Sequence, residues 1–447
     1  MAALARLSAS TQTSPSTVSS HSNAEWTNSR ARTVLRRLFE TATASANPRN
    51  AIANYLPPKP KGRCVVVGAG KAAAAMATAI DAEWPDVDLS GVVITRVGNA
   101  IAARRIEVVE TGYPIPDNRG LEGARRILSA VSGLSNEDLV ITVVSDGGAN
   151  LLPLPAGAMT LADEHAVFRA LLIKGAPYTE IRVVRKHLSA IKGGRLAYAA
   201  RPAHVTTLVV TDIPRGELLN SDIVPTIPDL STRADALAIV DRWSITLPRT
   251  ARAILEAVEE TVKPGEIAPD VRMVSEPSHM LEQAANFARS EGLTPLILAN
   301  EFMREGRELE IELARIARSV ANRGYPVAPP AVLLSSGERD PFAEDGLRHP
   351  NKDFLLRFAI QLSGAPRIWA IAGSTDGADG PYGHYAGAII APDTLDRARH
   401  INLDASEFIE NNDTEAYFGA LGDLIRTDAN MSYENDFRAV LIGHETA

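Results

Sequence analysis

The sequence is poor in cysteine, in long apolar runs and in positive charge. Cys64 is the only cysteine among 447 residues, which excludes a disulfide framework and a cysteine-based zinc site and suits a reducing compartment such as the cytoplasm. No apolar run reaches the roughly 20 residues that a transmembrane helix needs. The net charge of −8 argues against a general binder of nucleic acid or membrane surfaces.

The first residues lack both acids and a periodic apolar pattern. Residues 1–24 are rich in Ser, Thr and Ala and contain no acid before Glu25. This composition is compatible with an organelle transit peptide, but Arg6 is the only basic residue in it. We therefore expect residues 1–26 to form a disordered tail and leave them out of the fold.

Strand-like and helical patterns alternate through the rest of the chain. The alternation predicts an α/β fold with a doubly wound, mainly parallel sheet, in which ligands bind beyond the carboxyl ends of the strands. The proline-rich segment Gly324–Pro330 is the best candidate for a domain boundary. We expect an N-terminal α/β domain over residues 27–325 and a smaller C-terminal α/β domain over residues 326–447.

A glycine turn follows the first predicted strand. Cys64–Val67 is apolar and largely β-branched, as in a buried strand, and Gly68-Ala69-Gly70 then leads into an alanine-rich helix that starts at Lys71. Backbone N–H groups at such a turn favour an anion, and Lys71 adds a positive charge. We therefore assign Gly68, Gly70 and Lys71 to a phosphate or substrate site.

The turn itself allows three interpretations. It fits a variant of the dinucleotide fingerprint, but the next strand ends in Thr95-Arg96 without the acid that this fingerprint requires. A P-loop is excluded, because Val65 and Ala72 stand where glycine and Ser/Thr are required. A plain strand–helix turn with an exposed lysine remains open.

Two further strand ends carry polar residues. The predicted strand Leu139–Val144 runs into a glycine-rich loop that offers close backbone approach and hydrogen bonds, through Ser145, Asp146, Gly147, Gly148 and Asn150. The predicted strand Val205–Val210 leads to Asp212. A carboxylate at that position is a general base, a magnesium ligand or a helix cap.

A dense group of basic residues lies between these two strands. Arg185, Lys186, Lys192 and Arg195 surround Gly193-Gly194 without acids nearby in the sequence. A solvated charged face is the usual explanation. The glycines and the missing acids favour an anion-binding cleft formed by Arg185, Lys192 and Arg195, whereas His187 alone indicates nothing.

In the second domain, Asp376 and Asp379 lie three residues apart on a glycine-rich loop. Mobile oxygen ligands of this kind suit Mg²⁺ or the hydroxyl groups of a polyol. Two acids, a lysine and glycine-rich anion loops are together the usual components of a phosphoryl-transfer site.

These segments, taken in order, resemble the glycerate 2-kinase family, also called the MOFRL family, some members of which carry the name hydroxypyruvate reductase. The resemblance extends over about residues 31–443. It rests on Val67–Ala73, Tyr113–Asp117, Leu151–Pro155, Val184–Ala197, Thr211-Asp212, Pro225–Asp229, Ala234–Leu237, Thr375–Gly380 and Asn411–Asp413.

The resemblance implies a kinase that moves the γ-phosphoryl group of ATP to the 2-hydroxyl of D-glycerate with Mg²⁺, in a cleft between two domains. It places the family's catalytic lysine on Lys71 and its aspartate on Asp212, as base or metal ligand together with Asp376. It also places Glu338, Asn351, Asp376 and Asp379 on the second-domain side of the cleft. The implied partner is a small hydroxy acid or sugar acid, with no nucleic acid or membrane, and a homodimer is possible.

The loops depart from the family pattern. The family's S-G-G-G-S-A loop is here Ser145–Asn150, with Asp146 in place of a glycine, and its active-site arginine is replaced by Pro350. Tyr113 occupies the position of a family histidine. The family's late glycine-rich motif falls on Asp428–Asp436, which keeps little of it. Two alternatives follow: a relative with lost or changed chemistry, such as sugar-acid binding, lactone hydrolysis or isomerisation, and, with less support, a hydroxypyruvate reductase that uses NAD(P)H.

Overall fold

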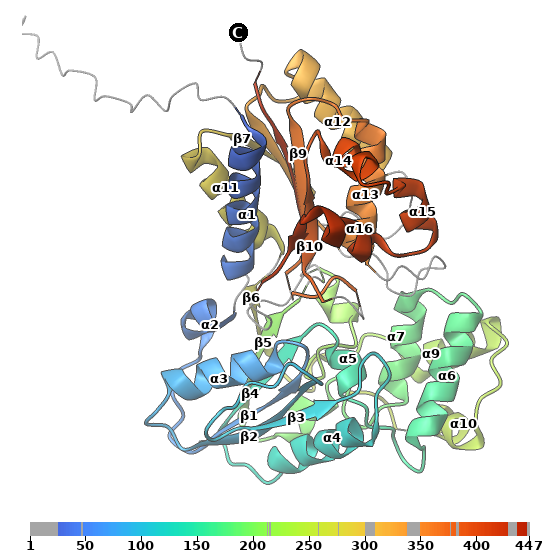
Figure 1. Cartoon of the computed structure of the whole chain (residues 1–447). Helices are drawn as coiled ribbons and strands as arrows, with labels where there is room; N and C mark the ends of the chain where they lie inside the picture. The colour runs from blue at the N-terminus through green and yellow to red at the C-terminus, as the bar shows by residue number, and fades with distance from the viewer. Residues whose placement is uncertain are drawn as a thin grey trace, which may run out of the picture.

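The chain forms two lobes, each built on its own sheet, one above the other (Figure 1). The structure is a computed structural model. It describes residues 26–45, 48–211, 213, 216–257, 259–275, 277–299, 309–337, 349–375, 377–380, 384–427 and 436–444.

The first lobe contains a parallel sheet with strand order β3-β2-β1-β4-β5-β6. Residues of β1 contribute alternately to two cores: Cys64 and Val66 pack with helix α3, whereas Val65 and Val67 pack with α4. Both faces of the strand are covered, which is why its sequence is apolar without interruption. The strands are β1 (Cys64–Ala69), β2 (Leu89–Arg96), β3 (Glu107–Thr111), β4 (Leu139–Ser145), β5 (His204–Val210) and β6 (Asp270–Ser275).

The prediction of a doubly wound parallel sheet is confirmed. Strand order reverses between β1 and β4, whose register pairs Ala69 with Val144. Sheets of this kind bind ligands at such a reversal point. The helices of this lobe are α2 (Pro48–Ala51), α3 (Ala73–Glu83), α4 (Asn118–Ala130), α5 (Gly148–Leu151), α6 (Leu161–Ile173), α7 (Tyr178–His187), α8 (Arg195–Ala199), α9 (Arg233–Arg242) and α10 (Arg249–Glu256).

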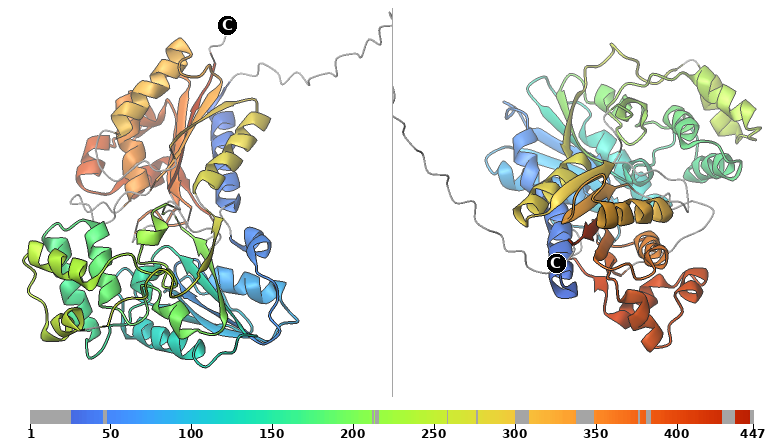
Figure 2. Two further views of the ribbon diagram at one scale, coloured as in Figure 1. Left: turned by 180° about the vertical axis from the view of Figure 1, so that it is seen from behind. Right: turned by 90° about the horizontal axis from the view of Figure 1, so that it is seen from above.

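Helices α6, α7, α9 and α10 form a separate helical layer beside the sheet (Figures 1 and 2). They share a core that includes Leu171, Ile181, Val184, Ile239 and Leu255. Helix α7 carries Arg185 and Lys186, the first half of the basic segment noted in the sequence, and this helical core fixes its orientation.

The second lobe contains a mixed sheet with strand order β11-β10-β9-β12-β8-β7. Strand β12 is antiparallel to both β8 and β9, whereas β7 and β8 are parallel. The strands are β7 (Thr294–Ala299), β8 (Ala331–Ser336), β9 (Ile368–Ser374), β10 (Gly387–Ile390), β11 (Leu424–Ile425) and β12 (Asp436–Ile442). The helices are α1 (Asn28–Ser45), α11 (Pro277–Ser290), α12 (Leu309–Arg323), α13 (Pro350–Leu362), α14 (Thr394–His400), α15 (Ala405–Glu410) and α16 (Thr414–Leu421).

The change from the first to the second sheet lies earlier than the expected boundary at 325/326. Helix α1 packs on α11 and on the face formed by β9 and β12, where the rings of Phe39 and Phe437 are 5.9 Å apart. Strand β7 pairs with β8. The first described helix, α1, therefore belongs to the second lobe, the chain then builds the first lobe, and it returns to the second between β6 and β7. The proline-rich segment is a loop between α12 and β8, inside the second lobe.

No helix in the described part of the chain combines the length and apolarity needed to span a bilayer.

Candidate functional site

The ends of β1 and β4 lie side by side at the reversal point. Gly68 and Gly70 have φ values of 146° and 147°, a conformation that side chains rarely adopt, and a Cβ on either would overlap atoms of β4. These glycines are therefore required for the close approach of the two strands. This packing places Lys71 next to the loop that follows β4.

The N–H groups of the glycine turn are used within the protein. Gly70 N–H donates to Ile94 O (3.1 Å), Lys71 N–H to Asp146 O (2.9 Å) and Ala72 N–H to Ser145 Oγ (2.8 Å). The prediction that this turn offers N–H groups to an anion is wrong, because the neighbouring strands approach closely enough to accept them. The Lys71 side chain is the remaining contribution of the turn to an anion site.

The loop after β4 offers the backbone donors that the first turn does not. Among the described residues, the N–H groups of Gly147 and Gly148 have no hydrogen-bond partner. Gly147 is left-handed (φ 76°), and a Cβ there would meet the ring of Tyr113 at 2.9 Å. The Lys71 Nζ lies 5.7 Å from the centre of that same ring. Lys71, Tyr113 and the two glycines thus form one group, which we call the strand-end site.

Asp146 connects this site to β5. Its Oδ1 accepts a hydrogen bond of 2.6 Å from the hydroxyl of Thr211, a buried residue directly after β5. The predicted catalytic Asp212 follows Thr211 and lies outside the described residues. Asp146, which replaces a family glycine, is half-buried and brings a carboxylate to this edge of the sheet.

Arg185 fixes the side chain of Asn150 by a hydrogen bond. The Arg185 guanidinium donates to Asn150 Oδ1 (2.9 Å) and Ala149 O (3.0 Å), and its Nε lies 3.3 Å from Asp222. It also lies over the ring of Phe168, 4.9 Å from its centre. Because Arg185 is only 7% exposed, it positions the loop after β4 and is not an open phosphate ligand.

The other predicted anion-binding cations also face inward. Lys192 is 1% exposed and donates to Leu152 O (3.1 Å), and burial, with repulsion from Arg185, lowers the pKa of Lys192 to about 8. Arg195 donates to Lys186 O (3.0 Å), and Lys186 forms a 2.5 Å ion pair with Asp229. The anion-cleft prediction for these residues is wrong, because Asp222, Asp229 and the main chain accept the charges. The acids come from a later part of the chain.

The structure brings two of the predicted second-lobe residues together, but in a buried cluster. Asp379 accepts hydrogen bonds from the N–H groups of Asn351 (2.8 Å) and Lys352 (3.0 Å), so it caps the start of α13. Asn351 and Asp379 are both fully buried, and burial raises the pKa of Asp379. Asp379 is therefore not the mobile cleft ligand that its loop suggested. Glu338 and Asp376 lie outside the described residues.

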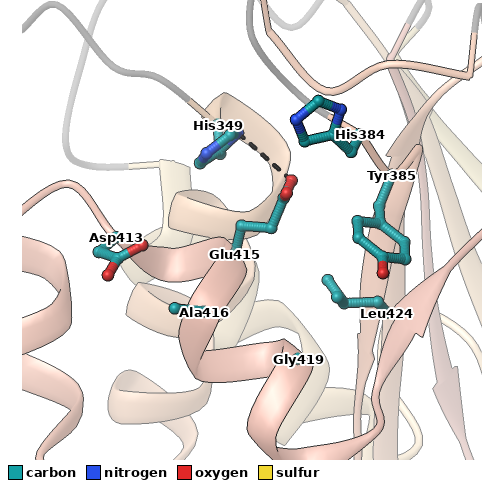
Figure 3. A pocket seen from close by; sticks show the side chains of 8 residues that line it. All are labelled: His349, His384, Tyr385, Asp413, Glu415, Ala416, Gly419 and Leu424. Carbon is teal, nitrogen blue, oxygen red and sulfur yellow. Dashed lines mark ion pairs between the residues drawn. The ribbon is translucent and has the colours of Figure 1, made fainter.

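Sequence reasoning missed a pocket in the second lobe, between the start of α13, α16 and the strands β10 and β11 (Figure 3). Its volume is about 730 Å³. The polar residues that line it are His349, His384, Tyr385, Asp413 and Glu415, and small or apolar residues complete the wall. Glu415 is fixed by Lys352, whose Nζ is 2.9 Å away, and by His349 at 3.7 Å. The only sequence signal was Asp413, at the end of a family-like motif.

Within the described part of the chain, no three His, Cys, Asp or Glu side chains are grouped so that they could hold a metal ion. The predicted metal ligands Asp212 and Asp376 lie outside the described residues.

Comparisons with known proteins agree with this arrangement. Residues 34–256 match a family described as a domain of unknown function (DUF4147), and residues 331–436 match the MOFRL family. A protein of Agrobacterium vitis, provisionally named hydroxypyruvate reductase, is 49% identical over 94% of this chain and 96% of its own length. The D-glycerate 2-kinase of Thermotoga maritima is 31% identical over 88% of this chain and 94% of its own length.

The fold agrees as well. The crystal structure of a glycerate kinase from Thermotoga maritima matches with a TM-score of 0.84 and 29% identity, over 93% of this chain and all of the other. The family that the sequence motifs indicated is thereby confirmed, and so is a phosphotransferase of the glycerate-kinase type. This chain belongs to the glycerate 2-kinase (MOFRL) family.

Proposed function

We propose that this protein phosphorylates the 2-hydroxyl of D-glycerate, or a hydroxyl of a related small sugar acid, with ATP and Mg²⁺. The relatives named glycerate kinase support the reaction type. The observation that carries the proposal is the strand-end site, where Lys71 lies beside two unused N–H donors at the reversal point of the sheet. Phosphoryl transfer depends mainly on positioning and charge stabilisation of this kind.

Each part of the site has a role in this proposal. The Lys71 ammonium group neutralises charge on the transferred phosphoryl group or orients the substrate carboxylate. The N–H groups of Gly147 and Gly148 donate to anionic oxygens, as at other glycine loops. Asn150, held by Arg185, offers an amide to the acceptor acid. Asp212 accepts the proton of the attacking hydroxyl.

Mg²⁺ would neutralise the phosphate charges of the donor. Carboxylate oxygens are its preferred protein ligands, and Asp146 brings one to this edge of the sheet, where Thr211 fixes it at 2.6 Å. Asp146, with Asp212 next to Thr211 and Asp376 from the second lobe, is the donor set that we propose for the ion.

The test is an assay of ADP release with ATP, Mg²⁺ and D-glycerate, with the product's phosphate position assigned by NMR. Lys71→Ala should lower kcat/KM about a thousandfold, because a charge aimed at the transition state is lost. Lys61→Ala, which removes an exposed lysine before β1, should change neither activity nor stability. A folded wild-type protein that releases no ADP with glycerate or with C4–C6 sugar acids would contradict the proposal.

A reductase remains the second candidate, because the Agrobacterium relative carries that name and because the strand order is that of dinucleotide-binding sheets. However, β2 ends in Thr95-Arg96, where these sheets carry an acid for the ribose. Both residues are occupied: Thr95 donates to Lys71 O (3.2 Å) and Arg96 to Asn99 (3.1 Å). A fluorescence titration with NADPH tests whether the protein binds the reductase cofactor, and absence of binding excludes this candidate.

Changed chemistry on the same scaffold is the third candidate. It is favoured by Asp146 and by Pro350, which is the first residue of α13 and takes the place of the family's arginine. Calorimetry with Mg·ATP separates it from the kinase: retained sugar-acid binding without ATP binding supports it, and tight ATP binding excludes it.

A further inference from the structure

The pocket of the second lobe has two chemically different walls. One wall carries the carboxylates of Asp413 and Glu415 at the start of α16, and the other carries the ring of Tyr385, with the imidazoles of His349 and His384 beside them (Figure 3). The Arg426 guanidinium lies over the Tyr385 ring, 4.7 Å from its centre. Between the two walls, Ala416, Gly419 and Leu424 leave space without adding charge. A ligand of this pocket therefore needs a flat or apolar body and several hydrogen-bond donors.

The two carboxylates of the pocket differ in what they offer a ligand. Burial pushes the pKa of Glu415 up, but the hydrogen bond and charge of Lys352 outweigh it, so the pKa is lowered and Glu415 stays ionised. Asp413 occupies the N-cap position of α16 but makes no side-chain capping bond, so its oxygens are not spent on the helix. The charge of Glu415 is balanced by Lys352 at 2.9 Å, so Asp413 is the carboxylate of this wall that is left to accept N–H and O–H donors of a ligand.

The size of the pocket decides against the acceptor acid. A volume of about 730 Å³ lies in the range of pockets for drug-sized ligands. A three-carbon acid would fill little of this volume. The uncharged base and ribose of a nucleotide fit both the volume and the donor requirement.

We propose that this pocket binds the nucleoside half of the phosphoryl donor, its base and ribose, while the phosphates extend to the strand-end site of the first lobe. The inference rests on the proposed kinase function. Tyr385 provides an aromatic surface for the base, and Asp413 accepts from ribose hydroxyls or ring amino groups. Helix α16 lies at the end of the second lobe that is turned toward the first (Figure 1).

Two identical substitutions on α16 test the proposal. Ala416 lines the pocket, whereas Ala420, one turn later and equally exposed, does not. Ala416→Leu should fill the space of the base and raise the KM for ATP about tenfold or more, at a cost of about 1.4 kcal/mol of binding. Ala420→Leu is the matched control and should leave the KM for ATP unchanged.

Two further measurements show whether the substitution affects the nucleoside or another part of the substrates. The KM for D-glycerate should stay within about twofold in both variants, since the acceptor binds elsewhere. Inhibition by tripolyphosphate, which has no nucleoside, should be equal in wild type and Ala416→Leu, whereas competition by adenosine should weaken in Ala416→Leu alone. Equal KM values for ATP in the two variants, or a selective change in the KM for glycerate, would overturn the inference while leaving the kinase intact.

The inference also has a test that does not need turnover. If the wild type phosphorylates none of the acids, calorimetry with ATP compares the same variants. Weaker ATP binding in Ala416→Leu than in Ala420→Leu supports the nucleoside pocket even though the proposed function has failed. Equal binding, or no ATP binding by the wild type, overturns it.

Discussion

The two lobes treat the start of a helix near their strand ends in opposite ways. In the first lobe, α5 starts at Gly148, right after β4, and its N-cap is Gly147, which has no side chain to satisfy the first N–H groups. In the second lobe, α13 starts at Pro350, and the carboxylate of Asp379 accepts the N–H groups of the next two residues. Among the described residues, the N–H groups of Gly147 and Gly148 at the start of α5 thus have no partner, whereas those of Asn351 and Lys352 in the first turn of α13 are bonded to Asp379.

The difference shows how to separate binding residues from structural ones when both are polar and lie in glycine-rich loops. Asp379 is surrounded by partners: Asn351, and Lys352, whose Nζ lies 3.3 Å from its Oδ2. Its hydrogen-bonding capacity is largely used inside the lobe. A ligand that replaced one of these partners of Asp379 would leave a buried charge or N–H group without a hydrogen bond, which costs free energy.

The largest expected effect is therefore on stability, at Asp379. Asp379→Ala should lower the free energy of unfolding by about 3–5 kcal/mol, because it leaves two buried helix N–H groups without their acceptor and removes one of the two carboxylates that pair with the buried Lys352. Chemical denaturation followed by circular dichroism measures it. Asp404→Ala, which removes an exposed cap from α15 (Ser406 N–H to Asp404, 2.8 Å), is the control and should cost only about 1 kcal/mol.

The same variant also tests whether Asp379 is a structural residue or a binding residue. The folded fraction of Asp379→Ala should keep its KM for D-glycerate, since this carboxylate does not meet the substrate. A variant that is as stable as the wild type but inactive would show that Asp379 is a site residue, and the contrast between the two lobes would fail.

Lys192 gives the next effect, which depends on pH. Burial lowers its pKa to about 8 in the folded protein, from the ordinary lysine value of 10.5. Between these two values the unfolded chain binds more protons than the folded one, so stability rises with pH. Relative to Lys192→Met, the wild type should gain about 3 kcal/mol of unfolding free energy from pH 8 to 10.5. Denaturant unfolding at several pH values measures this difference.

Lys174→Met is the control, since Lys174 is exposed at the end of α6; it should behave as the wild type does across the same range. A Lys192→Met curve that runs parallel to the wild type would mean that the Lys192 amine is solvated, as an open anion cleft would require.

Much of the first sheet could be predicted from its sequence. Strands such as β1 are short, apolar and bounded by glycine, and parallel order follows from their alternation with helices. The sequence assigned Gly68 and Gly70 to a ligand site, whereas in the structure they allow the close approach of β4. Which N–H groups remain available depends on the neighbours in space, and no local pattern contains that information.

The basic segment failed as a prediction for the same reason. Its four cations were judged by the acids near them in sequence. Asp222 pairs with Arg185 and Asp229 with Lys186 from a loop more than 30 residues later, and main-chain oxygens accept from the other two cations. The second-lobe pocket was missed because its walls come from three separate stretches around residues 349, 384 and 413–424. Long-range pairing of this kind is set by the fold, whereas motifs report only short segments.

The smallest expected effect tests the first lobe at Gly147. A Cβ at this left-handed residue would press on the Tyr113 ring, whose centre is 5.7 Å from the Lys71 amine. Gly147→Ala should therefore cost about 1 kcal/mol of stability through backbone strain and, in addition, lower kcat/KM about tenfold by shifting Tyr113 and Lys71. Gly133→Ala has nearly the same φ (71° against 76°) but no atom within 4 Å of the added Cβ, so it should show the strain alone. If both variants retain full activity, the ring of Tyr113 and the loop after β4 do not position Lys71. The open donors of Gly147 and Gly148 would then not distinguish the first lobe from the second.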